Sequence, residues 1–183
     1  VMQLECPNSF TEALGLKSKE QGIPVLLNAA PVKNFPNSWW NWIEILVVNE
    51  VEAFDLSGIK INNINDSFAC LKILQKRCRK TVITLGEKGL VYGTGSFIKY
   101  IAANPVKTVS TLGAGDAFVG VMAAEICKGN DLAKSIFLAS LAATATVTYP
   151  GAQSSYLKPM QLKNHPTLGE SYISALNPTN NSI

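Results

Sequence analysis

The chain has 183 residues, of which 47% are hydrophobic and 16% are charged, and its net charge at pH 7 is +3. That length gives a domain room for a sizeable core, and the composition excludes an intrinsically disordered chain. Basic residues are scattered apart from the short cluster between Lys76 and Lys80, which lacks the density of a nucleic-acid-binding patch. No apolar run has the length of a membrane span. We therefore expect no nucleic-acid partner and no membrane partner.

Strands and helices alternate along the sequence. The strands that we expect are residues 1–4, 25–27, 43–48, 81–85 and 90–92, the last as hairpin partner of the one before it. The expected helices are residues 10–21, a short one at 39–42, one that ends at Gly58, and residues 66–78, 114–127 and 131–148. Such alternation predicts an α/β fold, a three-layer, doubly wound and mainly parallel sheet.

Two boundaries complete this picture. The chain starts inside an apolar strand, which predicts a fold truncated at its amino terminus. We expect residues 1–165 to form the α/β part of the fold, and residues 166–183 to form a carboxy-terminal tail, frayed where it becomes polar from Asn177 onward.

Polar side chains follow four of the expected strands. They are Glu5, Asn28, Asn49 and Thr84. Because ligands of parallel α/β sheets bind beyond the carboxyl ends of the strands, these four residues are expected to share one rim of the sheet.

A glycine-rich turn leads into the helix expected at residues 114–127. Gly113, Ala114 and Gly115 precede Asp116 and an apolar run. Free backbone N–H groups at such a turn bind anions such as phosphate. A carboxylate beside bound phosphate is unusual, and it makes chemical sense as the base that deprotonates an attacking hydroxyl. The alternative is that Asp116 only helps to cap its helix.

Two other stretches have both a structural and a functional interpretation. Glu52, after Asn49, can be a carboxylate that favours a helix start, or the pair can order Mg²⁺ and its waters. Residues 84–89 can be a simple hairpin turn, and only a resemblance to a known family implies that they line a nucleotide site.

The residues from Thr111 to Phe118 resemble the carboxy-terminal signature D-T-x-G-A-G-D-x-F of the ribokinase (carbohydrate kinase) family. Further stretches, in chain order, are similar to other motifs of that family. They are Gln3–Glu5 (Q-x-E), Asn28–Pro31 (N-P-A-P), Asn49–Glu52 (N-x-x-E), Thr84–Gly89 (T-L-G-x-x-G) and Gly151–Ser155 (G-A-Q-x-S). The resemblance runs from Val1 to Leu162 and lacks a counterpart to the family's amino-terminal sugar-binding half and β lid.

The resemblance implies a role for each matching residue. Asp116 is implied as the catalytic base, Gly113, Ala114 and Gly115 as the anion hole, Asn49 and Glu52 as the magnesium pair, and Glu5 with Asp116 as sugar contacts. ATP contacts are implied for Asn49, Thr84, Leu85, Gly86, Gly89, Gly115 and Ser140. A K⁺ site is implied at Ser110, Leu112, Thr146, Tyr149, Gly151 and Ser155. Ser110 stands where the family usually has Asp, so the K⁺ site lacks one charged ligand.

The resemblance therefore implies a kinase that uses ATP, Mg²⁺ and K⁺ to phosphorylate D-ribose to ribose 5-phosphate. Alternatives are relatives that act on fructose or a nucleoside, and a catalytically silent chain that binds only nucleotide. Four cysteines without metal-ligand spacing and the single histidine His165 exclude a zinc site of several imidazoles and favour a reducing compartment, cytoplasmic or nuclear. A homodimer is one assembly that the resemblance implies for the full-length protein.

Overall fold

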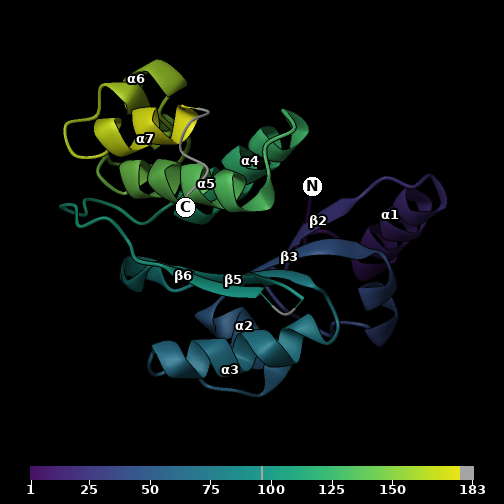
Figure 1. Cartoon of the computed structure of the whole chain (residues 1–183). Coiled ribbons are helices and arrows are strands. Elements are labelled where there is room, and N and C mark those ends of the chain that lie inside the picture. The colour runs from purple at the N-terminus through teal and green to yellow at the C-terminus, as the bar shows by residue number, and fades with distance from the viewer. Residues whose placement is uncertain (96, 178–183) are drawn as a thin grey trace. The chain divides into compact units, whose positions relative to one another are not determined.

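The computed structural model describes residues 1–95 and 97–177 (Figure 1). It divides into two compact units, Val1–Ala102 and Ala103–Ile183. In the part of the chain that the structure describes, no helix combines the length and the apolar character that crossing a membrane requires.

The first unit is built on a six-stranded sheet whose strands lie side by side in chain order. The strands are β1 (Met2–Gln3), β2 (Val25–Asn28), β3 (Ile43–Asn49), β4 (Lys80–Thr84), β5 (Leu90–Thr94) and β6 (Phe97–Ile101). Strands β1 to β4 pair in parallel, whereas β5 and β6 pair antiparallel to their neighbours. The expected α/β fold with a mainly parallel sheet is thus confirmed.

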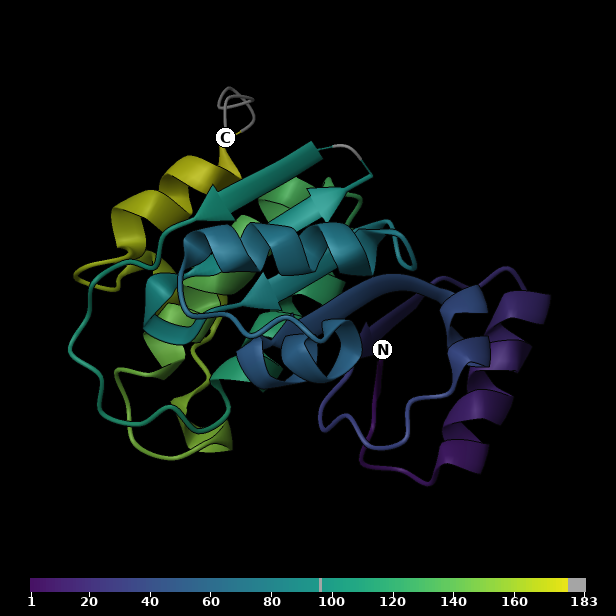
Figure 2. The ribbon, with the colours of Figure 1, turned by 90° about the horizontal axis from the view of Figure 1, so that it is seen from below.

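Helices connect the parallel strands of this unit. They are α1 (Asn8–Glu20), α2 (Glu50–Ser57) and α3 (Ile64–Gln75), with short 3₁₀ turns η1 (Asn37–Asn41) and η2 (Gly86–Lys88). Both views show α2 and α3 side by side over one face of β3, β4 and β5 (Figures 1 and 2). The buried apolar residues of these helices, among them Ala53, Leu71 and Leu74, belong to the core cluster that includes the sheet residues.

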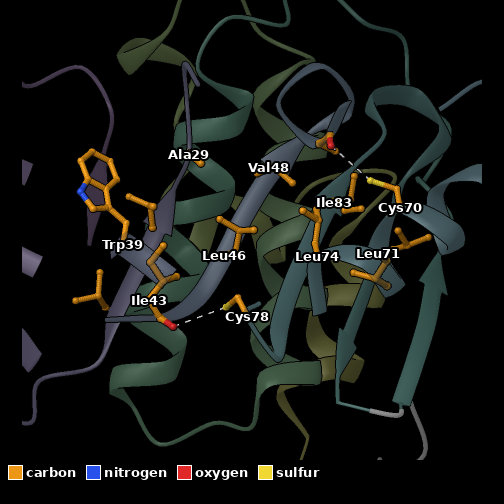
Figure 3. Packing of buried hydrophobic residues seen from close by; sticks show 14 of the residues in the cluster. Ala29, Trp39, Ile43, Leu46, Val48, Cys70, Leu71, Leu74, Cys78 and Ile83 are labelled. Atoms are coloured by element: carbon orange, nitrogen blue, oxygen red, sulfur yellow. Dashed lines mark hydrogen bonds between the residues drawn. The ribbon is translucent and has the colours of Figure 1, made fainter. Parts of the chain in front are cut away.

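The core of the first unit explains why its central strands read as continuous apolar runs. Leu46 and Ile83, on β3 and β4, are fully buried, and Leu71 and Leu74 of α3 pack against them (Figure 3). Trp39 of η1 closes the other end of the same cluster. Each such side chain contributes roughly 1.5–3 kcal/mol by leaving water, so this packing fixes the position of the strand ends.

One strand was absent from the sequence-based expectation. β6 consists of exposed and half-buried residues only, and Phe97 keeps 51% of its surface exposed. Because β6 forms the edge of the sheet and buries little, it leaves no clear apolar pattern in the sequence. Only its pairing with β5 identifies it as a strand.

The second unit is helical. Its elements are α4 (Ala114–Cys127), α5 (Leu132–Thr146), η3 (Gln153–Ser155), α6 (Pro159–Lys163) and α7 (Gly169–Leu176). α5 packs against α4 and α7, and α6 packs against α7. The predicted bounds of α4 are confirmed.

The stretch that we expected as a carboxy-terminal tail contains α7. Leu168, Tyr172 and Ala175 are buried there against Leu138 and Leu141 of α5. This packing, which joins residues some 30 positions apart, is what makes the stretch helical. The part of the tail for which fraying was expected lies, from residue 178 onward, outside the described residues.

Candidate functional site

The end of β3 and the start of α2 form a tightly hydrogen-bonded turn. Asn49 caps α2, and its side-chain oxygen accepts from the N–H groups of Val51 and Glu52 at 2.9 and 3.0 Å. In return the Glu52 carboxylate accepts from the backbone N–H and the side-chain amide of Asn49, at 2.8 and 3.0 Å. The two residues are therefore locked together in one arrangement, a capping box.

A second capping box in the same unit shows which property of Glu52 is unusual. Asn63 and Asp66 make the same reciprocal bonds at the start of α3, but Asp66 is only half-buried, and the N–H of Asn62 bonds to its carboxylate and lowers its pKa. Glu52 is buried, and this desolvation outweighs the hydrogen bonds from Asn49 and raises its pKa. Capping does not require burial, so a buried carboxylate at a strand end suggests a further role.

We expect the two carboxylates to affect stability with opposite pH dependence. The raised pKa of Glu52 means that its stabilising contribution is present below its usual value of 4.5 and is lost as the pH rises through the folded-state value. The lowered pKa of Asp66 means that its contribution is present above its usual value of 3.8 and is lost as the pH falls. The free energies of unfolding of Glu52→Gln and Asp66→Asn, measured with denaturant across pH 3–8 and compared with the wild type, give the pH dependence of each contribution. Parallel pH profiles for the two variants would contradict this assignment.

The chemistry of Asn49 and Glu52 suits an Mg²⁺ ion held through water. Both carboxylate oxygens of Glu52 already accept hydrogen bonds from Asn49, which leaves their outer lone pairs to accept from water. Mg²⁺ gives up its waters reluctantly, and proteins commonly hold it through few direct ligands. The pair therefore fits an ion whose remaining ligands are water and phosphate oxygens.

The turn after β4 lies beside this pair. Asn49 and Thr84 are direct partners in the parallel register of β3 and β4, and the Thr84 hydroxyl donates to the carbonyl of Val48. Leu85 and Gly86 follow, and the turn closes through Leu85 N to Gly89 O at 2.8 Å and Gly89 N to Gly86 O at 3.1 Å. The structure thus brings the N-x-x-E and T-L-G-x-x-G residues to adjacent strand ends.

An ion pair that the sequence did not indicate connects these two turns. Lys88 Nζ lies 3.5 Å from Glu50 Oε1, and the carbonyl of Lys88 accepts from the Tyr100 hydroxyl of β6 at 2.6 Å. Both contacts join residues distant in sequence, so no local pattern could have revealed them. The exposed ion pair contributes little to stability, but it restricts how the turns lie.

Two further polar residues lie at or just past the carboxyl ends of β1 and β2. Asn28 pairs with Gln3 in the parallel register, and Leu4 N donates to Ala30 O at 3.1 Å beyond it. Glu5, two residues past β1, is exposed. Since β1 to β4 are parallel, the expectation that Glu5, Asn28, Asn49 and Thr84 follow strands at one edge of the sheet is confirmed.

In the second unit, α4 begins at the glycine-rich turn. Gly113 is its N-cap with φ +77°, in the left-handed region that only glycine adopts readily, and this residue has no side chain with which to cap the helix. The first helical bond of α4 runs from Ala117 N to Gly113 O at 2.9 Å, so the amides of Gly115 and Asp116 precede it. Helices α2, α3 and α5 start instead with a side-chain cap.

The space around Gly115 differs from that around Gly113. An added Cβ at Gly115 would have no atom within 4 Å, and its φ is not positive, so neither the backbone nor the packing of the described residues requires glycine. Glycine in a helix costs about 1 kcal/mol relative to alanine. The exposed glycine directly before Asp116 therefore leaves room for a ligand to approach the backbone closely.

The residues expected at the K⁺ site are partly assembled. The N–H groups of Val109 and Ser110 both donate to the carbonyl of Val147, at 2.7 and 3.2 Å, which holds Ser110 at the carboxyl end of α5. Thr146 and Ser155 are buried, and their hydroxyls donate to Ala142 O and Ala152 O. Leu112 and Tyr149 are exposed.

The last of the expected ATP contacts lies on α5. Ser140 is half-buried, and its hydroxyl donates to Phe137 O at 2.7 Å. This bond to the preceding turn is that of an ordinary helical serine, so it does not by itself indicate a ligand.

Comparison with known proteins supports one family. The model of the pfkB family of carbohydrate kinases matches residues 1–159. Ribokinase of Staphylococcus aureus (strain COL) is 36% identical over 157 residues, which are 85% of this chain and 52% of that protein. Deoxyribokinase of Salmonella typhi is 32% identical over 154 residues, which are 83% of this chain and 50% of that protein.

A solved structure agrees in fold. Ribokinase of Arabidopsis thaliana, in complex with ribose and ATP, superposes with a TM-score of 0.81 at 24% identity, over 96% of this chain and 54% of that one. The chain spans about half the length of the curated relatives that it matches.

Proposed function

Because the chain belongs to the pfkB family of carbohydrate kinases, we propose that it carries the nucleotide- and phosphate-binding part of a kinase that transfers phosphate from MgATP to the primary hydroxyl of D-ribose. The observation that carries this proposal is the start of α4. There an exposed glycine with open space at its Cα lies directly before Asp116, in the first turn of a helix whose N-cap residue is itself a glycine. That arrangement suits an anion bound next to a carboxylate base.

Each set of residues has a role in this proposal. Asp116 takes the proton of the attacking hydroxyl as it forms its bond to phosphorus. The amides of Gly115 and Asp116 stabilise the charge that develops on the transferred phosphoryl group. Asn49 and Glu52 hold the waters of an Mg²⁺ ion, which when bound neutralises phosphate charge.

The relatives support two candidate sugars for this proposal. One relative is a ribokinase and another is a deoxyribokinase, at similar identity. These two sugars differ by one hydroxyl group, so a polar contact to that group discriminates between them. Glu5, exposed beyond β1, is the candidate on this chain. Glu5 favours ribose, and deoxyribose is the second candidate.

The proposal is tested in two steps that separate binding from catalysis. The 183-residue chain is expected to bind MgATP weakly and to leave ribose unphosphorylated, because only Glu5 and Asp116 remain as sugar contacts and catalysis depends on positioning. Isothermal titration with MgATP and a labelled-ribose assay measure both. A chimera in which this chain replaces the matching part of the Staphylococcus aureus ribokinase is then assayed with ribose, deoxyribose, fructose and a nucleoside. MgATP binding without transfer in the chimera would favour a catalytically silent nucleotide-binding chain instead.

Ser110→Asp is expected to strengthen K⁺ activation of the chimera several-fold, because it restores a charged oxygen ligand where the wild type has a neutral hydroxyl. The substitution suits the local backbone, since the Ser110 hydroxyl already accepts from Leu112 N at 3.3 Å and a carboxylate can accept the same bond. Titration of K⁺ against rate in both versions, with constant ionic strength, measures the change. Identical activation curves would remove Ser110 from the cation site.

A further inference from the structure

Tyr156 lies against the turn that precedes α4, although the two are 43 positions apart in the sequence. A Cβ added to Gly113 would lie 2.8 Å from the Tyr156 hydroxyl oxygen, 3.0 Å from Cε1 and 3.2 Å from Cζ. The hydroxyl-bearing edge of the ring therefore covers the Cα of Gly113. This contact gives Gly113 a second reason to be glycine besides its positive φ.

The position of this ring is set by the residues on either side of it. Ser155 is buried, with its hydroxyl bonded to Ala152 O, and Tyr156 N donates to Gln153 O. Leu157 packs onto the core formed by α5, α6 and α7. Tyr156 thus points from an anchored 3₁₀ turn, η3, toward Gly113.

The hydroxyl of Tyr156 is available for a ligand. The ring is 38% exposed, and within residues 1–95 and 97–177 no side chain or backbone group forms a hydrogen bond with its oxygen. Desolvation and the nearby negative charge of Asp116 raise the pKa of Tyr156, so the phenol keeps its proton at neutral pH. It is therefore a donor beside Gly113, the N-cap of α4, and within electrostatic range of the Asp116 carboxylate.

We propose that the Tyr156 hydroxyl donates a hydrogen bond to the terminal phosphoryl group bound at residues 113–116, as a third donor beside the Gly115 and Asp116 amides. This inference rests on the proposed function, because it assumes that a nucleoside triphosphate places its last phosphate at this turn. A donor there compensates for the repulsion between phosphate and the Asp116 carboxylate. It also links the G-A-Q-S-S segment to the phosphate, through the residue that follows it.

The test compares nucleotides that differ by one phosphate. MgATP, MgADP and inorganic phosphate are titrated into the 183-residue chain as wild type, Tyr156→Phe and Tyr156→Ala. Tyr156→Phe keeps the ring over Gly113 and removes only the donor, so MgATP affinity is expected to fall about 10-fold while MgADP affinity stays within about two-fold. Tyr172→Phe removes one phenol oxygen elsewhere in the same unit and is expected to leave both affinities unchanged.

Several outcomes would overturn the inference. Equal MgATP affinities for wild type and Tyr156→Phe, with a loss only in Tyr156→Ala, would show that the ring packs and that the hydroxyl binds nothing. Equal losses of affinity for MgATP and MgADP would place the contact away from the terminal phosphate. In contrast, inorganic phosphate that binds the wild type and not Tyr156→Phe would support the contact, because no nucleotide is then present. A wild-type chain that binds no MgATP would contradict the proposed function itself, which distinguishes the two failures. The ¹³Cζ resonance of Tyr156 in the wild type gives a readout without any variant, and is expected to shift with MgATP and not with MgADP.

Discussion

Asp116→Ala is expected to lower phosphoryl transfer in the chimera roughly 10²–10⁴-fold, while MgATP affinity stays the same or rises slightly. The reason is that Asp116 is the carboxylate at the exposed start of α4, where it can deprotonate a hydroxyl that attacks bound phosphate. Its removal eliminates the base but retains the backbone amide. It also removes a negative charge that repels the nucleotide. Steady-state rates and titration of MgATP measure the two effects separately.

The matched control for this substitution is Asp116→Asn. Asparagine keeps the size and polarity of the side chain and cannot accept the proton, so a base at this position predicts the same large loss of turnover. Asp131→Asn, at the start of α5, changes a carboxylate that caps its helix, through a 2.7 Å bond from Lys134 N. It is expected to leave the rate unchanged. Near-normal turnover in Asp116→Asn would show that this carboxylate is not the base.

Gly115→Ala is expected to weaken MgATP binding to the 183-residue chain about 10- to 100-fold without destabilising the fold. The methyl group would occupy the open space at Gly115, displacing phosphate from backbone amides whose charged hydrogen bonds are worth roughly 1.5–3 kcal/mol each. The fold should become more stable by about 0.4–1 kcal/mol, because the substitution restricts the unfolded chain and meets no atom of the described residues. Nucleotide titration tests the expected loss of MgATP affinity, and denaturant unfolding tests the expected gain in stability.

Gly120→Ala is the control in the same helix. Gly120 also has open space at its Cα and no positive φ, but it lies more than a helical turn after the backbone amides of Gly115 and Asp116. Its replacement is expected to stabilise the chain similarly and to leave MgATP affinity unchanged. If both variants lose affinity equally, the space at Gly115 has no particular relation to phosphate. A strong loss of stability in Gly115→Ala would show that the glycine serves the fold instead.

Local sequence patterns were sufficient to predict the elements that depend mainly on residues close together in the chain. The apolar run of β3 predicts a strand buried on both faces, because no side of it can face water. The small residues before Asp116 predict where α4 begins, since a glycine-rich turn followed by an acidic residue and an apolar run is typical of a helix start. The motifs that resemble the ribokinase family consist of residues close together in the chain, so the amino-acid sequence alone is enough to indicate the family.

The tertiary structure decided the properties that depend on distant neighbours. Asn49–Glu52 and Asn63–Asp66 have the same local pattern, and only packing buries Glu52 and reverses its pKa shift relative to Asp66. β6 and α7 exist because β5 and α5 pair and pack with them, which no short window of sequence records. Tyr156 acquires its position over Gly113 in the same way, from an anchored turn 43 residues later. The sequence by itself thus determined strands β1 to β5, the start of α4 and the family, because these follow from local backbone preferences and short motifs. Burial, the pairing of β6 and the surroundings of the turn at Gly113 could be seen only in the tertiary structure, because they depend on contacts between residues that are distant in the sequence.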